Sequence, residues 1–208
     1  MSAGPQTQSP RLPGSLPVAG WDDLKVLSLV IAEAFHGLAP SRWLISDPGE
    51  RRAIFPPMFQ IYVELALASG FVRTNPDRTA AAVWLHVRDG HDDASLDHDE
   101  RLAAATGPHI ERFRLFDRHL QERHPTGVDH YHLAMLAVHP GVQRRGIGSA
   151  LLSAAHETLD QAGIPAYLEA SDTGTRSLYL RHGYADRGEP VQLPDGPQMY
   201  PMWRLPVS

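Results

Sequence analysis

Apolar residues recur every three or four positions after Asp22 and Asp23, either of which can cap the start of a helix. The residues of this stripe are Leu24, Leu27, Ile31 and Phe35. Gly37 follows the stripe, so the pattern predicts one amphipathic helix that ends at this glycine. A short strand is predicted before it, over residues 15–19, at the edge of a sheet because it contains Pro17.

A second helical stripe begins after a predicted loop over residues 37–48, which carries Arg42 and Trp43. The apolar face of this helix is formed by Phe55, Phe59, Tyr62 and Leu65 or Ala66. Pro56 and Pro57 lie within the stripe. We expect them to kink or restart the helix, because proline lacks the N–H of the helical hydrogen bond.

The pattern changes to alternation over residues 70–87. Residues 70–74 and 79–87 read as two strands joined by the polar turn 75–78, which has a suitable length for a hairpin. The next stretch, residues 89–100, is dense in aspartate and histidine and is predicted to be a solvated loop. A metal site built from His91, Asp92, Asp97 and His98 is the weaker alternative, and no metal is expected.

A third helix is predicted from Pro108, and residues 124–127 end it. Its inward positions are Ile110, Phe113, Phe116 or Asp117, and Leu120. The central strand follows over residues 131–138. Its alternation places on one side His130, His132, Ala134, Leu136 and Val138. Two histidines two positions apart can share a zinc ion, but no third ligand has a recognisable spacing.

The last third of the chain alternates between strands and helices. A helix is predicted from Gly146 to Gln161 and is closed by Gly163. Its expected inward residues are Ile147, Ala150, Leu151, Ala154 and Thr158. A strand over 164–170, a short helix containing Tyr179, and a hairpin of residues 187–193 and 198–205 follow. This order predicts a parallel central pair of strands bounded by antiparallel strands, which is a mixed α/β fold.

Composition narrows the class of protein. The chain has 208 residues, of which 42% are hydrophobic, so we expect one domain over residues 15–208 behind a disordered leader over residues 1–14. The formal net charge of -5 argues against nucleic acid as the main partner. No apolar run is long enough to span a membrane. Cysteine is absent, which excludes a thiolate nucleophile and favours a cytoplasmic location.

Candidate chemistry centres on the turn after the central strand. Residues 139–141 stop an apolar run at Val138, and Gly146 and Gly148 leave the N–H groups of a new helix unobstructed. Such N–H groups, with the helix dipole behind them, attract anions. The sequence of the turn is Gln143-Arg144-Arg145-Gly146-Ile147-Gly148. The Lys and Ser/Thr of a P-loop are missing, so a nucleoside-triphosphate-binding protein is the remotest alternative.

This turn resembles the acetyl-CoA signature of the GNAT acetyltransferase superfamily, which is Gln or Arg, two variable residues, Gly, one variable residue, then Gly or Ala. Leu136, Val138 and Pro140 match the strand and proline that precede the signature. The aromatic segment expected further along is Leu178-Tyr179-Leu180-Arg181-His182-Gly183-Tyr184. The resemblance implies the GNAT fold, in which helices flank a central mixed sheet of about six to seven strands. It places acetyl-CoA at a splay between the two central parallel strands.

The resemblance also implies how acetyl-CoA is held. The strand end is expected to pair with the pantetheine arm, and the glycine turn to bind the pyrophosphate. A backbone N–H near Leu136 or Ala137 is expected to polarise the thioester. The implied cofactor-binding residues are Leu136, Ala137, Val138, Gln143, Arg144, Arg145, Gly146, Ile147, Gly148, Ser149 and Asp172. Asp172 stands where the superfamily commonly has asparagine.

Catalytic candidates follow from the same resemblance and from the residue types. Tyr179 matches the superfamily's general acid, and a phenol with a pKa near 10 is protonated at neutral pH; packing in the core is the alternative. Glu169 lies inside an apolar strand, where partial burial would raise its pKa. It is the candidate general base or amine-binding carboxylate, against a structural hydrogen-bonding role. His132 is the second candidate base, and Glu33 and Glu64 could act through water.

In the resembled superfamily the first two helices and their loop form one wall of the acceptor pocket. The candidate pocket residues are therefore Trp43, Phe55, Phe59 and Tyr62, each of which can instead pack in the core. The C-terminal half is most similar to puromycin N-acetyltransferase-type enzymes, over residues 162–171, 178–184, 193–197 and 202–204. That similarity implies an amine on a small, partly aromatic molecule, and with it a role in antibiotic resistance.

The predicted function is an acetyl-CoA-dependent N-acetyltransferase that acts on a primary amine of a small molecule by direct attack in a ternary complex. The alternatives are acetylation of a protein lysine or N-terminus, and a non-catalytic acetyl-CoA sensor. The expected partner is a small-molecule amine, with neither nucleic acid nor membrane, and a homodimer is left open.

Overall fold

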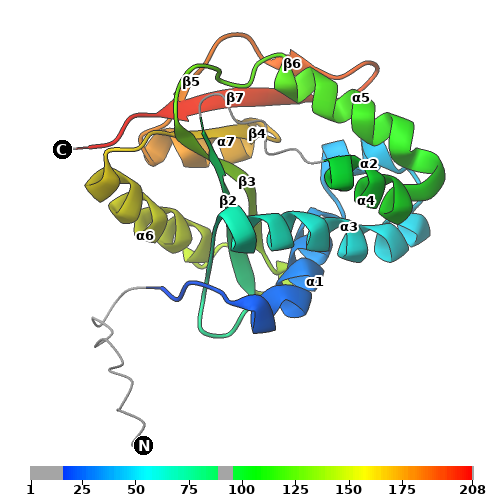
Figure 1. The fold of residues 1–208 in the computed structure, drawn as a ribbon, viewed down its shortest axis with the longest axis horizontal. Coiled ribbons are helices and arrows are strands. Elements are labelled where there is room, and N and C mark those ends of the chain that lie inside the picture. The colour runs from blue at the N-terminus through cyan, green and yellow to red at the C-terminus, as the bar shows by residue number, and fades with distance from the viewer. Residues whose placement is uncertain (1–15, 89–95, 208) are drawn as a thin grey trace, which may run out of the picture.

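The computed structural model describes residues 16–88 and 96–207 and shows a seven-stranded mixed sheet between two groups of helices (Figure 1). The strands follow the order β1-β2-β3-β4-β7-β5, and β6 pairs with β7. They are β1 (Gly70–Thr74), β2 (Ala80–Val87), β3 (His130–Val138), β4 (Ala166–Ala170), β5 (Ala185–Asp186), β6 (Val191–Gln192) and β7 (Gln198–Arg204). Only β3 and β4 pair in parallel within the described ranges, which confirms the predicted mixed α/β architecture. The predicted leader over residues 1–14 lies outside the described residues.

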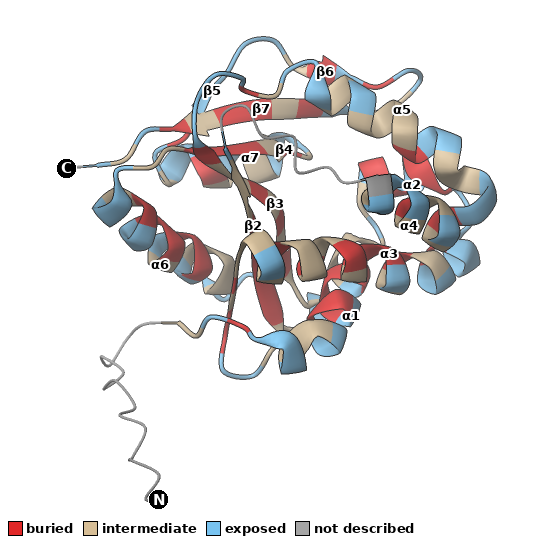
Figure 2. Cartoon of the chain, viewed as in Figure 1, coloured by how far each residue is buried: buried red, intermediate tan, exposed pale blue. Residues whose placement is uncertain are grey.

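Two groups of helices cover opposite faces of the sheet (Figure 1). One face carries α1 (Leu24–Phe35), α2 (Ala39–Leu44), α3 (Pro48–Ser69), α4 (Leu96–Thr106) and α5 (Ile110–Gln121). The other face carries α6 (Ile147–Ala162) and α7 (Thr173–Arg181). Short 3-10 helices precede α1, α5 and α6, at Trp21–Asp23, Gly107–His109 and Pro140–Val142. Each face has its own buried apolar core, and the buried sides of β2, β3 and α6 form the interior of the molecule (Figure 2).

The predicted hairpin at residues 70–87 is confirmed, and a side chain explains its turn. Asn75 Oδ1 accepts hydrogen bonds from the N–H groups of Thr79, at 2.9 Å, and Ala80, at 3.0 Å. An asparagine that bonds the backbone a few residues later reverses the chain without help from the strands. The edge strand predicted at residues 15–19 is reduced to a single bridge, in which Val18 pairs with Arg73 of β1.

Two helices were not predicted. α2 lies where a loop was expected over residues 37–48, and α4 occupies the second half of the expected Asp/His loop over residues 89–100. α2 has six residues, too few to show helical periodicity. α4 has a charged first turn, and its buried residue Leu102 packs against the α1 to α5 core. Of the proposed metal ligands, His91 and Asp92 lie outside the described residues.

The predicted restart of the second helix at Pro56 and Pro57 is wrong, because α3 is continuous from Pro48 to Ser69. Asp47 caps its start, since Oδ1 accepts the N–H of Glu50 at 2.8 Å. Phe55 and Phe59 are buried beside the prolines, and edge-on ring contacts join Phe59 to Phe55 at 5.4 Å and to Phe35 at 5.3 Å. Burial of this aromatic side offsets the helical hydrogen bonds that two prolines remove.

The alternation predicted that every second side chain of β3, from His130 to Val138, lies on one face of the sheet. The structure shows that this is wrong. Opposite β2, Val83 pairs with Met135 and Trp84 with Leu133, so Ala134 is an extra residue in β3. Such a β-bulge reverses the alternation of the side chains beyond it. Leu136 and Val138 therefore pack on the α6 side, together with Leu133. His132 lies on the opposite face, towards α1 to α5.

The predicted inward face of α6 is wrong at two of its five positions. Ala150 and Thr158 are exposed, and the buried residues of the helix are Leu151, Leu152, Ala155, His156 and Leu159. This row packs against Ala80, Ala82 and Leu133 of β2 and β3, which fixes the rotation of the helix. The end of α6 is as predicted, because Gly163 adopts the left-handed conformation with φ 67° and its N–H donates to Asp160 O.

His156 makes the fold sensitive to acid. It is 6% exposed, its Nε2 lies 3.2 Å from the Tyr184 hydroxyl, and burial, followed by the positive charge of Arg204, lowers its pKa to about 3. The unfolded chain binds this proton below its ordinary pKa of about 6.5, so stability is lost as the pH falls from there towards 3. The free energy of unfolding should drop by about 2 kcal/mol between neutrality and pH ~5 from this group alone. Urea denaturation over that range checks it. The drop should be smaller in His156→Gln, and an unchanged pH slope in that variant would contradict the assignment.

Candidate functional site

β3 and β4 separate after two residue pairs. Tyr131 pairs with Ala166 and His132 with Tyr167, and over the described residues no further pairing joins the two strands. β3 nevertheless continues to Val138 and β4 to Ala170. Backbone N–H and C=O groups on the facing edges of the two strands are therefore free for another extended molecule. The predicted splay between the two parallel strands is confirmed.

The chain after β3 is held in a tight turn by its own side chains. The N–H of His139 donates to Thr79 O at 2.8 Å, and His139 Nδ1 accepts the N–H of Gly141 at 3.1 Å. His139 Nε2 lies 2.7 Å from Glu33 on α1, so Glu33 is engaged in a surface ion pair. Gln143 Nε2 donates back to Val138 O at 3.0 Å. These contacts fix the turn against β2, β3 and α1.

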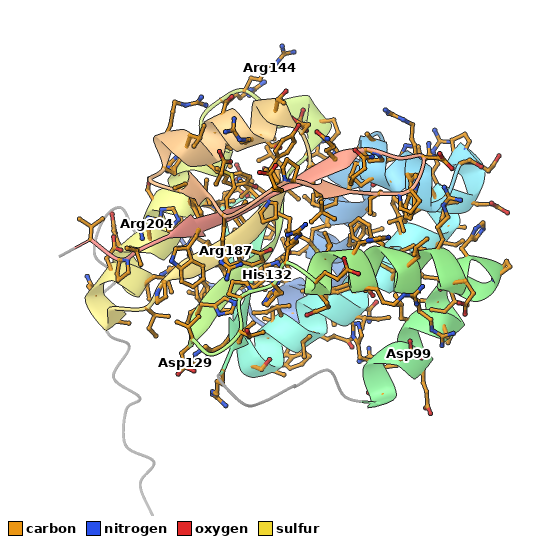
Figure 3. The ribbon with its side chains drawn as sticks, turned by 90° about the horizontal axis from the view of Figure 1, so that it is seen from above. Asp99, Asp129, His132, Arg144, Arg187 and Arg204 are labelled. Carbon is orange, nitrogen blue, oxygen red and sulfur yellow. The ribbon has the colours of Figure 1, made fainter. Side chains whose placement is uncertain are left out.

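The start of α6 lies directly beyond this turn. Gly146 has φ 79°, a left-handed conformation that favours glycine, and its carbonyl accepts the N–H of Ala150. The N–H groups of residues 147–149 precede the first helical bond and point out of the helix end. Arg144 and Arg145 are exposed beside them, and Figure 3 shows Arg144 projecting from the rim of the molecule. The arrangement suits a diphosphate.

Glu169 and His132 face one another across the point where β3 and β4 separate. His132 Nε2–H donates to Glu169 Oε2 at 2.9 Å, since a carboxylate can only accept. Burial favours the neutral acid, but the charge and hydrogen bond of His132 outweigh it and hold the pKa of Glu169 below its usual value. This direction is opposite to the upward shift expected from the sequence. Glu169 Oε1 is buried and makes no hydrogen bond of standard geometry within the described residues, while the nearby Tyr167 hydroxyl helps to lower the pKa of Glu169.

A cluster of three histidines adjoins this pair. The sequence pattern had indicated the two histidines of β3 but not the third. The ring of His124, which follows α5, lies 5.1 Å from each of the rings of His130 and His132. His130 Nδ1–H donates to Val128 O, so its Nε2 accepts from His124 Nε2–H at 3.1 Å. Burial, followed by the charge of His132, lowers the pKa of His124 to about 4. His124 is therefore neutral. It lies in the loop between α5 and β3, and no motif in the sequence predicted its contact with the strand.

Tyr179 of α7 lies on the α6 side of the sheet. It is 8% exposed and its ring meets Tyr184 edge-on at 5.7 Å. Burial and then the carboxylate of Asp172 raise the pKa of the Tyr179 phenol, which keeps it protonated at neutral pH. Asp172 itself caps α7, since Oδ1 accepts the N–H of Thr175 at 2.8 Å. Its contact with the cofactor stays a prediction.

Three of the four predicted pocket residues are buried. Phe55 and Phe59 belong to the core, and Trp43 is 8% exposed with its indole N–H donating to Pro194 O at 2.8 Å. Only Tyr62 remains half-buried, with its ring 5.3 Å from that of His98 on α4. Glu64, two residues further along α3, accepts hydrogen bonds from Gln60 and Arg101.

The contact of Trp43 with the β6–β7 turn predicts a defined loss of stability. A Cβ added at Gly196 would lie 2.4 Å from Trp43 Cδ1 and 2.5 Å from Nε1. Gly196→Ala should therefore lower the free energy of unfolding by about 1–3 kcal/mol, because the rigid indole must move. Urea denaturation measures this. Gly37→Ala is the matched control, since a Cβ there meets nothing within 4 Å, and equal stability of the two variants would contradict the prediction.

Two classes of site find no support. In residues 16–88 and 96–207, no group of three or more His, Asp and Glu side chains is arranged to hold a metal ion. Of the helices that the structure describes, none combines the length and apolar character needed to cross a membrane.

Comparison with known proteins identifies the same region. Residues 113–186 match the family model described as acetyltransferase (GNAT) domain, which covers α5 to β5 and so contains the splay and the glycine turn.

Solved structures share the whole architecture. A Corynebacterium glutamicum protein described as histone acetyltransferase HPA2 and related acetyltransferase has a TM-score of 0.66 at 24% identity, covering 93% of this chain and 97% of its own. Arylalkylamine N-acetyltransferase 2 from Aedes aegypti has a TM-score of 0.66 at 10% identity, with 92% and 98% covered. An agmatine N-acetyltransferase has a TM-score of 0.58 at 15% identity, with 91% and 98% covered. At these identities the likeness establishes the fold.

The chain therefore has the GNAT fold, and its residues 113–186 match the acetyltransferase (GNAT) domain model.

Proposed function

We propose that this protein transfers the acetyl group of acetyl-CoA to a primary amine of a small molecule, by direct attack in a ternary complex. The observation that carries this proposal is the splay of β3 and β4, with the turn before α6 at one end and the Glu169–His132 pair at the other. The sequence contains no cysteine that could carry the acetyl group as a thioester, which supports direct transfer.

The residues around the splay fit acetyl-CoA. On the edge of β3 that faces away from β2, the N–H and C=O of Leu136 and the N–H of Val138 can bond to the amides of a pantetheine arm. The N–H groups of residues 147–149 and the exposed Arg144 and Arg145 suit its phosphates. Acetyl-CoA would supply the acetyl group as an activated thioester and leave as the free thiol.

Proton removal from the acceptor falls to the Glu169–His132 pair. Because Nε2–H of His132 is committed to Glu169, Nδ1 is the ring atom that can take up a proton from the acceptor. Oε1 of Glu169, a carboxylate oxygen, can accept a hydrogen bond from the entering ammonium group as well as from the neighbouring Tyr167 hydroxyl. Tyr179, protonated and buried, donates a proton to the leaving sulfur.

Two neighbours in fold, an arylalkylamine and an agmatine N-acetyltransferase, support a small amine as the acceptor. The narrower similarity to puromycin N-acetyltransferase-type enzymes adds puromycin to the amines worth testing. A protein lysine or N-terminus is the alternative acceptor, supported by the Corynebacterium structure described as a histone acetyltransferase and related acetyltransferase.

The test is calorimetric titration with acetyl-CoA, followed by measurement of thiol release with a panel of small amines, puromycin and lysine-containing peptides. We expect binding of acetyl-CoA and thiol release that depends on a small amine. Thiol release only with peptides would favour the alternative acceptor. Tight binding without release on either panel would favour a sensor, and no binding would contradict the proposed function.

A further inference from the structure

β4 sends two polar side chains to the face of the sheet that carries α1 to α5. The residues that alternate with them pack in the core on the α6 side; they are Ala166, Leu168 and Ala170. Because successive side chains of a strand alternate, Tyr167 and Glu169 both point to the opposite face. Tyr167 is fully buried, and the side chain of Glu169 is only 5% exposed. A phenol and a carboxylate are therefore neighbours on one strand, away from water.

The ring of Tyr167 is surrounded by the three histidines of the cluster. Its centroid lies 4.8 Å from that of His124, 5.5 Å from that of His132 and 6.0 Å from that of His130. Figure 3 shows His132 in the interior of the molecule, and its Nε2–H is the donor to Glu169 Oε2 at 2.9 Å. Tyr167 and Glu169 thus contact the same imidazole, and the packed rings fix the direction of the phenol.

Two buried polar atoms of this group make no hydrogen bond of standard geometry in the part of the chain that the structure describes. They are the Tyr167 hydroxyl and Glu169 Oε1. Each costs free energy while it has no partner, and the hydroxyl can donate where the carboxylate can only accept. The lone pairs of the imidazole rings are neutral acceptors, whereas the charged carboxylate forms the stronger hydrogen bond. Burial acts to raise the pKa of Glu169, and His132, His124 and the Tyr167 hydroxyl together lower it.

We propose that Tyr167 is a positioning residue for acetyl transfer, whose hydroxyl donates to Glu169 Oε1 while His132 donates to Oε2. This inference rests on the proposed function, in which His132 takes up the proton of the acceptor. A carboxylate that is held at both oxygens cannot rotate away from His132, so the imidazole keeps Nε2–H towards Glu169 and Nδ1 available to the amine. The remaining lone pair of Oε1 stays open to the ammonium group. Tyr167 itself transfers no proton and does not touch the substrate.

Steady-state thiol release by Tyr167→Phe, with the best amine of the panel, tests the effect on catalysis. Phenylalanine keeps the ring among the histidines and removes only the hydroxyl, so kcat should fall about tenfold, as for a lost charge-assisted hydrogen bond. The KM for acetyl-CoA should stay within about twofold, because the glycine turn is untouched. Combining Tyr167→Phe with Glu169→Gln should give about the same activity as Glu169→Gln alone, since the hydroxyl acts through the carboxylate.

Tyr131→Phe is the matched control. Tyr131 lies on the neighbouring strand β3, where its ring packs on the α6 side and stacks on His86 at 4.5 Å. The variant also removes one phenol hydroxyl, but on the face opposite to Glu169. Its kcat should therefore equal that of the unaltered protein.

Proton NMR at neutral pH tests the hydrogen bond itself and does not depend on turnover. In the unaltered protein the Tyr167 hydroxyl should give a resonance that exchanges slowly with water, identified by its nuclear Overhauser effect to the protons of the Tyr167 ring. In Glu169→Gln this resonance should move upfield, because a neutral amide oxygen is a weaker acceptor than a carboxylate. Tyr131→Phe should leave it in place.

Three outcomes would overturn the proposal. One is the absence of a slowly exchanging Tyr167 hydroxyl in the unaltered protein, a result that holds even if Tyr167→Phe fails to fold. Another is a hydroxyl resonance that Glu169→Gln leaves unmoved, which would assign the hydrogen bond to another acceptor. The third is an unchanged kcat in Tyr167→Phe, or losses that multiply in the double variant. In each case turnover of a small amine by the unaltered protein still supports the proposed function. Absence of thiol release with every amine would remove the proposed function and the positioning role together.

Discussion

Replacing Glu169 by glutamine should lower kcat/KM for amine acetylation by about 10³-fold, within the range that general acid–base groups contribute. Glutamine has nearly the same shape, and its amide oxygen can still accept the hydrogen bond of His132 Nε2–H. What is lost is the negative charge that favours a protonated His132 once the acceptor has given up its proton. Thiol release with the best amine of the panel measures the effect, and binding of acetyl-CoA should stay unchanged.

Coupling between the two residues provides the control. If Glu169 acts through His132, the double variant with His132→Gln should be no slower than the slower single variant, because residues that work as a unit are not additive. Independent losses that multiply would mean separate roles. Retention of more than about half of the activity in Glu169→Gln would leave the carboxylate with a structural role only.

Tyr179→Phe should lower kcat by about 10²-fold with little change in the KM for acetyl-CoA. Phenylalanine keeps the ring contact with Tyr184 and removes only the hydroxyl, so packing is preserved. The reason for the loss is the missing hydroxyl, which is protonated at neutral pH and is the proposed proton donor to the leaving sulfur. Pre-steady-state thiol release separates this chemical step from binding.

Tyr184→Phe is the matched control for that experiment. Tyr184 belongs to the same core cluster, but its hydroxyl is within hydrogen-bond distance of His156. Its loss should lower stability and leave kcat unchanged. Unaltered turnover in Tyr179→Phe would make the general-acid role untenable and would favour the packing role.

Elements specified by local sequence could be predicted, and elements specified by distant contacts could not. The β1–β2 hairpin and the end of α6 depend on Asn75 and Gly163, whose own backbone and side chain fix the geometry. The continuity of α3 through two prolines depends instead on packing against α1, which periodicity does not reveal. α4 was missed for a similar reason, since its first turn is charged and only Leu102 is deeply buried.

The candidate site divides in the same way. The glycine turn and the β3 edge are contiguous in sequence and were predicted from a motif, and Glu169 was recognised as an ionisable group in an apolar strand. The direction of its pKa shift was wrong, because it is set by His132, which is distant in sequence and adjacent in space. His124 contacts the site from the loop after α5, and nothing in its local sequence distinguishes it from a surface residue.

The extra residue in β3 gives the strand two functional halves with different neighbours. Up to the bulge at Ala134, the strand sends His132 to the face where the acceptor is proposed to bind, and beyond it Leu136 and Val138 turn to the face of α6. Insertion or deletion of one residue at this point is therefore not a local change. Every side chain between residue 134 and the end of the strand would move from the hydrophobic core on one face of the sheet to the core on the other. The length of β3 is thus constrained more tightly than the identity of its residues.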